Sequence, residues 1–168
     1  MKHSYKYCPF YCEENIWHLA NQIKNGHVIF ISNALRQTAV FNQLNCFADE
    51  AIFWDYHVVL IKDKQVYDFD SRLGFPIALS DYLQQSFQKD IAAEHQAKFK
   101  VIPATDFLAK FASDRRHMVD DDGLFIADPP DWDCITTNES SFNLDAFIDM
   151  TKNEYPVLSR DELEQHMF

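Results

Sequence analysis

The spacing of apolar residues in the N-terminal part of the chain predicts a helix followed by a buried strand. From Cys12 to Asn25, apolar side chains recur at intervals of three and four residues, as on one helix face: Ile16, Leu19, Ala20 and Ile23. Asn25-Gly26 supplies a C-terminal stop for this helix. The next segment, HVIFIS at residues 27–32, is mostly apolar and predicts a short buried strand.

Two segments rich in β-branched and aromatic residues predict a β-hairpin in the middle of the chain. They are residues 50–62 (EAIFWDYHVVLIK) and 65–71 (QVYDFDS), and the polar residues between them can form a turn. If the strands pair across a two-residue turn, His57, Asp68 and Asp70 lie on one face of the hairpin. Asp70 is then directly opposite His57 and Asp68 diagonal to it, and a two-residue register shift exchanges these positions.

The second half of the chain predicts fewer regular elements. FKVIP at residues 99–103 predicts a strand, and TDFLAKFASDRRHM at residues 105–118 predicts a helix with Thr105 as its N-cap. Residues 118–135 predict an irregular loop, because they contain an acidic run and a Pro-Pro pair. Ser159 and Glu162 stand at capping-box spacing and predict a short terminal helix.

The chain contains no repeat, low-complexity stretch or internal linker. These elements therefore predict one α+β domain over residues 1–168, with an antiparallel sheet packed against helices. The length of 168 residues suffices for a substantial core, and a hydrophobic content of 47% is ordinary for a globular protein.

The amino-acid composition argues against several classes of function. The formal net charge of −11 disfavours binding to nucleic acid or to an anionic membrane. The three glycines are scattered, which excludes the clustered glycines of phosphate-binding loops. No apolar run approaches the length of about 18 residues that a membrane helix needs, and the first residues lack the apolar core of a signal peptide. We therefore expect a location in the cytoplasm, with the nucleus as a further location. We also expect a monomer, although composition does not determine the oligomeric state.

Metal binding is not expected from the cysteines or from the acidic run. Cys8 and Cys12 could begin a zinc site, but the remaining two cysteines stand alone and do not supply the second pair. The acidic run at residues 120–122 lacks the acid and the glutamate that a calcium-binding loop would place at positions 118 and 129. In the reducing compartment expected here, the even number of cysteines is not evidence of disulfides.

Cys12 is the candidate nucleophile, because it falls at the start of the predicted helix. Backbone N–H groups and the helix dipole at such a position stabilise a thiolate and could bind an oxyanion. Glu13 and Glu14 act against this by repelling a thiolate, so the argument needs a neighbouring base. The alternative is that Cys12 is a small buried hydrophobic residue, which is the commoner role of a cysteine.

His57 is the candidate base, although a hydrogen-bonded core histidine would fit the same pattern. A carboxylate beside an imidazole fixes its tautomer and stabilises the imidazolium, and Asp68 or Asp70 could supply it. A cysteine at a helix start with a histidine and an aspartate on adjacent strands is the arrangement of papain-like and transglutaminase-like nucleophiles.

Six motifs in order along the chain carry a resemblance to a known family. They are YCEENIW, FISN, WDYHVVL, VYDFD with the following FP, FASDRRHM, and PP with the later CI. Together, from about Tyr7 to the terminal helix, they resemble the protein N-terminal glutamine amidohydrolases. The resemblance implies conversion of an N-terminal glutamine of a protein or peptide to glutamate with release of ammonia.

The resemblance also implies a transglutaminase-like core and a Cys-His-Asp triad without metal or organic cofactor. Matched by motif, the nucleophile is Cys12, the base is His57 and the orienting acid is Asp68. The choice of Asp68 over Asp70 depends on the resemblance. The hairpin register alone leaves both open.

Recognition of a substrate's free N-terminus requires an anionic group for its α-ammonium. Glu13, Glu14 and Asp55 are the candidates, with solvated surface acids as the alternative, and Trp54 could form a pocket wall or belong to the core. Three other functions remain open. They are a transglutaminase that transfers the acyl group to an amine, a papain-like protease, and a non-catalytic acidic module that binds peptides.

Overall fold

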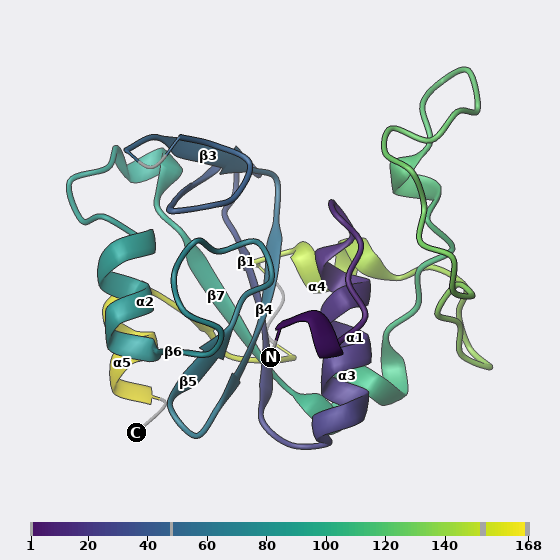
Figure 1. Ribbon diagram of the computed structural model, residues 1–168, viewed down its shortest axis with the longest axis horizontal. Coiled ribbons are helices and arrows are strands. Elements are labelled where there is room, and N and C mark those ends of the chain that lie inside the picture. Colours follow the sequence, from purple (N-terminus) through teal and green to yellow (C-terminus); the bar gives the residue numbers. More distant parts are fainter. Residues whose placement is uncertain (1, 48, 152–153, 167–168) are drawn as a thin grey trace.

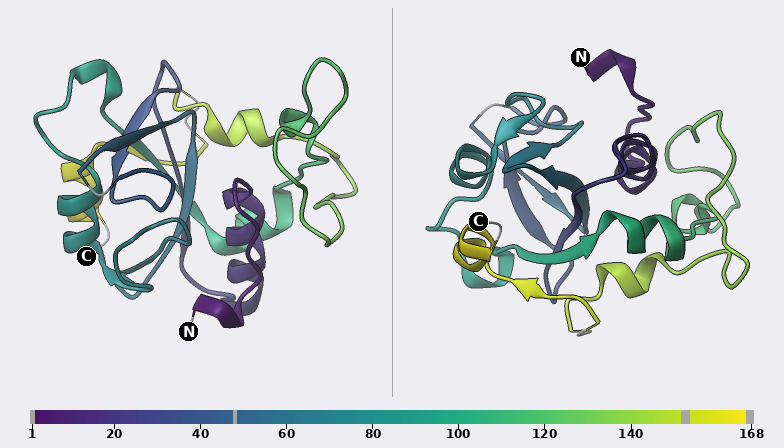
Figure 2. Two further views of the ribbon diagram at one scale, coloured as in Figure 1. Left: turned by 45° about the horizontal axis from the view of Figure 1, so that its top comes forward. Right: turned by 90° about the horizontal axis from the view of Figure 1, so that it is seen from below.

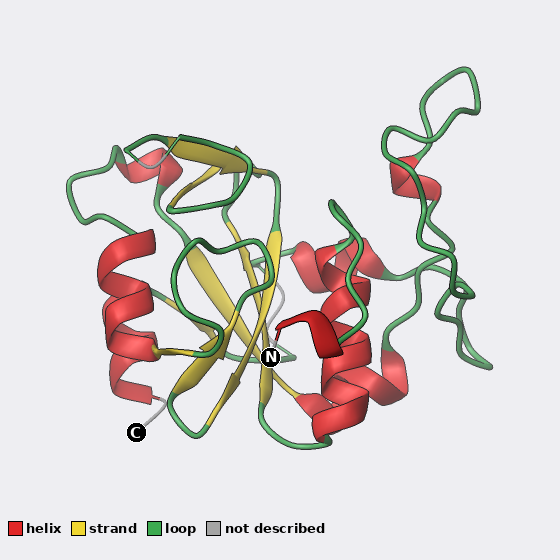
Figure 3. Ribbon diagram, viewed as in Figure 1, coloured by secondary structure: helices red, strands yellow, loops and turns green. Residues whose placement is uncertain are grey.

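The computed structural model describes residues 2–47, 49–151 and 154–166 as a sheet between two groups of helices (Figures 1 and 3). The sheet is antiparallel throughout and has the strand order β6-β5-β4-β1-β7-β8. The strands span β1 His27–Ser32, β4 His57–Lys62, β5 Gln65–Tyr67, β6 Ile77–Ala78, β7 Lys98–Pro103 and β8 Val157–Leu158. The α+β architecture expected from the sequence is confirmed.

Helices cover both faces of this sheet. One face carries α1 Cys12–Ile23, α3 Ala104–Lys110 and α4 Leu144–Ile148, and the other carries α2 Leu79–Ser86 and α5 Arg160–His166 (Figure 1). Single turns of 3₁₀ helix span η1 Lys2–Ser4, η2 Ala93–His95 and η3 Arg116–Met118. No helix among the described residues is long and apolar enough to cross a membrane.

The continuous apolar run in β1 is explained by burial on both faces of the sheet. Val28 and Phe30 face α1 and its neighbours, whereas Ile29 and Ile31 face α2. Phe30 packs among Phe107, Phe111 and Phe147 with ring centroids 5.5–6.5 Å apart. Burying each such side chain contributes roughly 1.5–3 kcal/mol, so this cluster fixes the helices against the strand that leads toward the site.

The segment predicted as one strand at residues 50–62 is two strands in different sheets. Ala51–Trp54 forms β3, which pairs with β2 Thr38–Phe41 in a small separate sheet, and β4 starts at His57. At the break, Ser32 Oγ donates a hydrogen bond to the Asp55 carbonyl (2.6 Å), and the Asp55 side chain accepts one from the Tyr56 N–H (2.9 Å). The single-strand prediction is wrong here because the chain turns at Asp55, where one of the two hydrogen bonds comes from the distant Ser32.

The hairpin turn is confirmed, but its second strand is shorter than predicted. Lys62 pairs with Gln65, and Asp63 and Lys64 both have positive φ (51° and 60°), as a two-residue turn of type I′ requires. The strand β5 ends at Tyr67, so Asp68 and Asp70 lie beyond it.

The helix predicted at residues 105–118 ends early, and its predicted N-cap is wrong. The helix α3 stops at Lys110, and its N-cap is Pro103, so Thr105 lies within the first turn. After α3, the Ser113 N–H donates to the Ile135 carbonyl (2.8 Å), which closes the base of a long loop. Residues 119–134 form no helix or strand, as predicted, and project from the α1 side of the molecule (Figure 1).

The predicted capping box at the terminal helix is confirmed. The Ser159 N–H donates to Glu162 Oε2 (2.6 Å), and the Glu162 N–H donates to Ser159 Oγ (3.3 Å). At the other end of the chain, the N-terminal segment lies beside α1 in both views of Figure 2. Asn15 fixes this segment, because its amide group bonds both the N–H and the carbonyl of Cys8 (2.8 Å each).

Candidate active site

Cys12 is the first residue of α1 and lines a pocket of about 270 Å³ together with His57 and Asp70. It is partly buried. The preceding residue, Tyr11, offers no side-chain cap to the first helical turn, so the N–H groups there remain available to an anion. Tyr11 instead points away, and its hydroxyl donates to the Ala127 carbonyl (3.0 Å).

His57 stands at the start of β4, where the chain enters the main sheet from the small one. Its Nε2 lies 2.9 Å from Asp68 Oδ1, and both side chains are buried. The indole of Trp54 stacks on the imidazole with centroids 5.9 Å apart and an interplanar angle of 12°. Because Nε2 is engaged by Asp68, Nδ1 is the ring nitrogen left to exchange a proton with a group in the pocket.

Asp68 has four hydrogen-bond donors around its carboxylate. In addition to His57, the Asp70 N–H donates to Oδ1 (2.9 Å), and Gln43 Nε2 (3.1 Å) and the Tyr82 hydroxyl (2.9 Å) donate to Oδ2. Burial by itself would raise the pKa of Asp68, but His57 and the other hydrogen bonds lower it to about 2. The group is therefore a firmly held anion at neutral pH.

Asp70 lies close to Asp68 but has a different hydrogen-bond partner. Its Oδ1 accepts a hydrogen bond from the Tyr7 hydroxyl (2.8 Å), and no described contact joins it directly to the imidazole. Burial, followed by the charge of Asp68, raises the pKa of Asp70 despite the opposing effect of His57. The structure thus separates the two aspartates that the hairpin register left open, because the one bonded to His57 is Asp68.

The electrostatics of His57 and Cys12 favour a neutral thiol beside a basic imidazole. Burial lowers the pKa of His57, but the charge and hydrogen bond of Asp68 outweigh it, so the pKa is raised. The pKa of the Cys12 thiol is raised well above its usual value by burial and then by Glu13, although a hydrogen bond from the Val58 N–H favours the thiolate. The lowering expected from the helix start alone is therefore outweighed.

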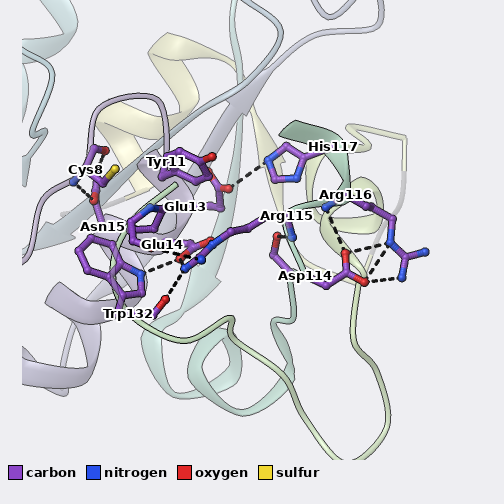
Figure 4. Close-up of polar contacts among 12 residues, drawn as sticks. Cys8, Tyr11, Glu13, Glu14, Asn15, Asp114, Arg115, Arg116, His117 and Trp132 are labelled. Carbon is purple, nitrogen blue, oxygen red and sulfur yellow. Dashed lines mark hydrogen bonds and ion pairs between the residues drawn. The ribbon is translucent and has the colours of Figure 1, made fainter. Parts of the chain in front are cut away.

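The two glutamates after Cys12 are both fully buried, and they have different partners. Glu14 forms a bidentate ion pair with Arg115 (2.8 and 2.9 Å) and accepts a bond from the indole N–H of Trp132 (2.7 Å; Figure 4). Arg115 also donates to the carbonyls of Pro130 and Trp132. Glu14 therefore ties α1 to the long loop and does not line the pocket.

Glu13 lies next to the pocket and is the acid that contributes most to raising the pKa of the Cys12 thiol. Its Oε2 lies 3.7 Å from the Cys12 sulfur and accepts a hydrogen bond from the Tyr56 hydroxyl (2.9 Å). Its Oε1 lies 3.2 Å from His117 Nε2. Tyr56 and His117 also line the pocket and are not among the site residues predicted from the sequence. Both residues belong to motifs that carry the family resemblance (WDYHVVL and FASDRRHM), and these motifs are the sequence signal by which they could have been identified.

Asp55 and Trp54, which the sequence predicts as substrate contacts, both line the pocket, and their contact with substrate stays a prediction. Asp55 is exposed at the rim. Among the described residues, His57, Asp68 and Asp70 are also close enough to share a metal ion, with potential ligand atoms within 4.8 Å of one another. The hydrogen bond between Asp68 and His57 accounts for the proximity of these two groups, and Asp68 accepts three further hydrogen bonds.

A cysteine and a histidine in one pocket, with a buried carboxylate behind the imidazole, are the groups that thiol-dependent amide hydrolases and acyl transferases use. Comparison with known proteins narrows the class. Residues 7–167 match the model of the N-terminal glutamine amidase family, and the chain belongs to that family.

Three relatives illustrate the extent of the similarity, and each is named protein N-terminal glutamine amidohydrolase. The chain is 40% identical to the Danio rerio protein over 159 residues, covering 86% of this chain and 79% of the relative. It is 38% identical to the Homo sapiens protein, with 86% and 78% covered. The Drosophila melanogaster protein is 36% identical over 180 residues, with 96% and 88% covered.

Proposed function

We propose that this protein hydrolyses the side-chain amide of an N-terminal glutamine in a protein or peptide, giving glutamate and ammonia. The observation that carries the proposal is the pocket shared by Cys12 and His57, with the imidazole bonded to buried Asp68, in a chain of the N-terminal glutamine amidase family. The reaction needs only these side chains and water, so it calls for no cofactor.

In the first half of the reaction, His57 Nδ1 takes the thiol proton as the sulfur attacks the amide carbon of the substrate side chain. Backbone N–H groups at the start of α1 stabilise the oxyanion. The imidazolium, stabilised by Asp68, then protonates the departing nitrogen, and ammonia leaves a γ-thioester on Cys12. The raised pKa of the thiol makes this proton transfer necessary, because the resting sulfur is protonated.

In the second half, His57 removes a proton from a water molecule, and the resulting hydroxide attacks the thioester carbonyl. The C–S bond breaks, the sulfur recovers its proton from the imidazolium, and the product is a γ-carboxylic acid that gives its proton to the released ammonia or to solvent and becomes a carboxylate. One water is consumed and one ammonia released in each cycle.

Selectivity for an N-terminal residue is assigned to the acids of the pocket. Asp55 is the candidate for direct contact with the α-ammonium, because it is exposed at the rim. Glu13 lies buried behind the sulfur and supplies a negative field without being at the pocket surface. Glu14 is neutralised by Arg115, which argues for a structural role. Trp54 forms a wall and holds the imidazole plane.

The partner of this site is therefore the N-terminal segment of a substrate chain. We further propose that the protein acts as a monomer in the cytoplasm or the nucleus, without nucleic-acid or membrane partners. The formal net charge of −11 supports the last part, because it repels phosphate-bearing surfaces.

The test compares two peptides of the same composition, one beginning with glutamine and one with glutamine in second place. Ammonia release and the amide-to-acid mass change are followed for the wild type and for Cys12→Ala. We expect conversion of the first peptide alone and its loss in the variant. Conversion of neither peptide by folded wild-type protein would contradict the proposal and favour a peptide-binding module.

The same reactions distinguish the two other enzymatic alternatives. Addition of a primary amine would trap a transglutaminase reaction as an amide adduct, and mass spectrometry of the peptide would reveal backbone cleavage by a protease. We expect neither product, because the proposed acceptor of the acyl group is water.

A further inference from the structure

A large groove adjoins the catalytic pocket, and no step of the proposed reaction involves it. This groove, which we call the downstream groove, has a volume of about 1140 Å³. It lies between residues 33–36, the segment from Phe87 to Lys98, and residues 145–151 that include the end of α4. Arg36, Asp145 and Ile148 line both the downstream groove and the catalytic pocket, so the two adjoin at these residues.

The relative sizes indicate which part of a substrate each hollow can hold. The catalytic pocket, at about 270 Å³, falls just below the range of roughly 300–1,000 Å³ that is usual for drug-sized ligands. It therefore suits a single residue. A protein substrate continues beyond its first residue, and that continuation must leave the pocket across its rim. The downstream groove is about four times larger and adjoins the pocket at Arg36, Asp145 and Ile148.

The walls of the downstream groove are held in place by buried polar side chains. Asn33 Nδ2 donates to the carbonyls of Gln37 and Glu94 (3.0 Å each), which ties one wall to the other side of the groove. On the α4 side, the buried Lys100 ammonium donates to the carbonyls of Ala146 (3.1 Å) and Asp149. These hydrogen bonds are made within the chain and fix the walls of the groove, and a fixed groove lowers the entropic cost of binding.

The charges of the downstream groove fit a chain of variable sequence. Its lining contains four basic and four acidic side chains, so it is formally neutral in a protein of net charge −11. Apolar side chains such as Phe87, Ile91 and Met150 alternate with these charges along the walls. A neutral, mixed surface contacts backbone and side chains of many sequences without selecting one charge.

The boundary between the two hollows is an exposed ion pair. Both terminal nitrogens of Arg36 lie 3.1 Å from Asp145 Oδ1, and the two side chains are 47% and 67% exposed. Exposed pairs of this kind contribute about 0–1 kcal/mol, so a substrate chain can pass over or displace it at little cost.

On the basis of the proposed function, we propose that the downstream groove binds the polypeptide segment that follows the N-terminal glutamine. The substrate class is then a chain with an extended, accessible N-terminal segment. Free glutamine and short glutamine peptides would occupy the catalytic pocket alone.

The experiment measures kcat/KM for peptides that begin with glutamine and differ only in length, from a dipeptide to an octapeptide of neutral sequence. We expect kcat/KM to increase about tenfold or more with length, since binding energy from remote residues lowers the barrier at the reacting centre. Equal values at all lengths would overturn the inference while leaving the proposed function intact. Absence of ammonia from every peptide would instead contradict the proposed function.

The chain offers a matched pair of variants for the same assay. Ala93 and Ala92 are adjacent exposed residues, and only Ala93 lines the groove. Ala93→Trp should reduce kcat/KM about tenfold for the octapeptide and leave the dipeptide unchanged, whereas Ala92→Trp should change neither. Ala146→Trp, which fills the groove from α4, should reproduce the effect if Ala93→Trp proves unstable in a melting experiment.

Two results would contradict the inference. One is an equal loss for dipeptide and octapeptide in the groove variants. The other is a change in oligomeric state, seen by sedimentation, in variants whose octapeptide rates are unchanged, since the groove would then be a contact between copies of this chain.

Discussion

The contact between Asp68 and His57 makes a sharp prediction for the paired substitutions Asp68→Asn and Asp70→Asn. An asparagine at 68 can keep an oxygen toward the imidazole, and Gln43 can rotate its amide to accept from the new NH₂. Gln43 Oε1 has no hydrogen-bond partner among the described residues, so this rotation breaks no bond of that atom. The substitution therefore removes a charge and largely preserves the shape.

The size of the effect follows from the geometry. An imidazolium and a carboxylate 2.9 Å apart, at an effective dielectric constant of about 20, attract each other by roughly 4–6 kcal/mol. This attraction is present when His57 carries the thiol proton and absent when it is neutral. Since each 1.36 kcal/mol is tenfold in rate, Asp68→Asn should reduce kcat by about 10³–10⁴.

Asp70→Asn is the matched control, because Asp70 is a neighbouring buried aspartate without a described bond to the imidazole. Its replacement keeps an acceptor for the Tyr7 hydroxyl, and kcat should fall by less than about tenfold. The assay is ammonia release from a glutamine-initiated peptide at saturating concentration, with melting temperatures to verify folding. The reasoning is refuted if Asp70→Asn loses as much activity as Asp68→Asn, or if Asp68→Asn stays within tenfold of the wild type.

Three further predictions concern the surroundings of the site. Glu13→Gln removes the negative charge that helps raise the thiol pKa, so the pH dependence of Cys12 alkylation by iodoacetamide should move to lower pH; an unchanged profile would refute the assignment. Arg115→Met leaves the Glu14 carboxylate buried without its cation and should destabilise the fold by about 3–5 kcal/mol, measured by thermal unfolding, with partial recovery when Glu14→Gln is added. Tyr82→Phe removes one hydrogen bond to the orienting acid, and kcat should fall about three- to tenfold at unchanged KM, as the net value of about 1 kcal/mol for such a bond implies; a change in KM alone would indicate another role.

The sequence predicted well those elements whose signal is local. The helix α1, the strands β1 and β7, the hairpin turn and the final capping box all follow from periodicity or from residues a few positions apart. The small sheet, α2 and α4 were not predicted, because their short segments carry no distinctive pattern and gain stability from packing. The break at Asp55 was missed for a related reason, since one of its hydrogen bonds comes from Ser32.

The features of the candidate site also divide into those that have a local signal in the sequence and those that depend on contacts between distant residues. The residues Cys12 and His57 were identifiable from local context, and the family motifs selected Asp68. Burial of Glu13 and Glu14 contradicts the usual exposure of acids, and it depends on partners such as Tyr56 and Arg115 that lie far away in the sequence. No local pattern contains that information.

Two of the four hydrogen-bond donors that hold the Asp68 carboxylate come from residues outside the pocket. Gln43 lies in the connection between the two strands of the small sheet, and Tyr82 belongs to α2, which covers the opposite face of the main sheet from α1. The alignment of the reacting groups is thus determined by how two distant parts of the molecule pack together. Two family members with identical pocket walls could therefore differ in turnover, and the residues at positions 43 and 82 are where that difference should be sought.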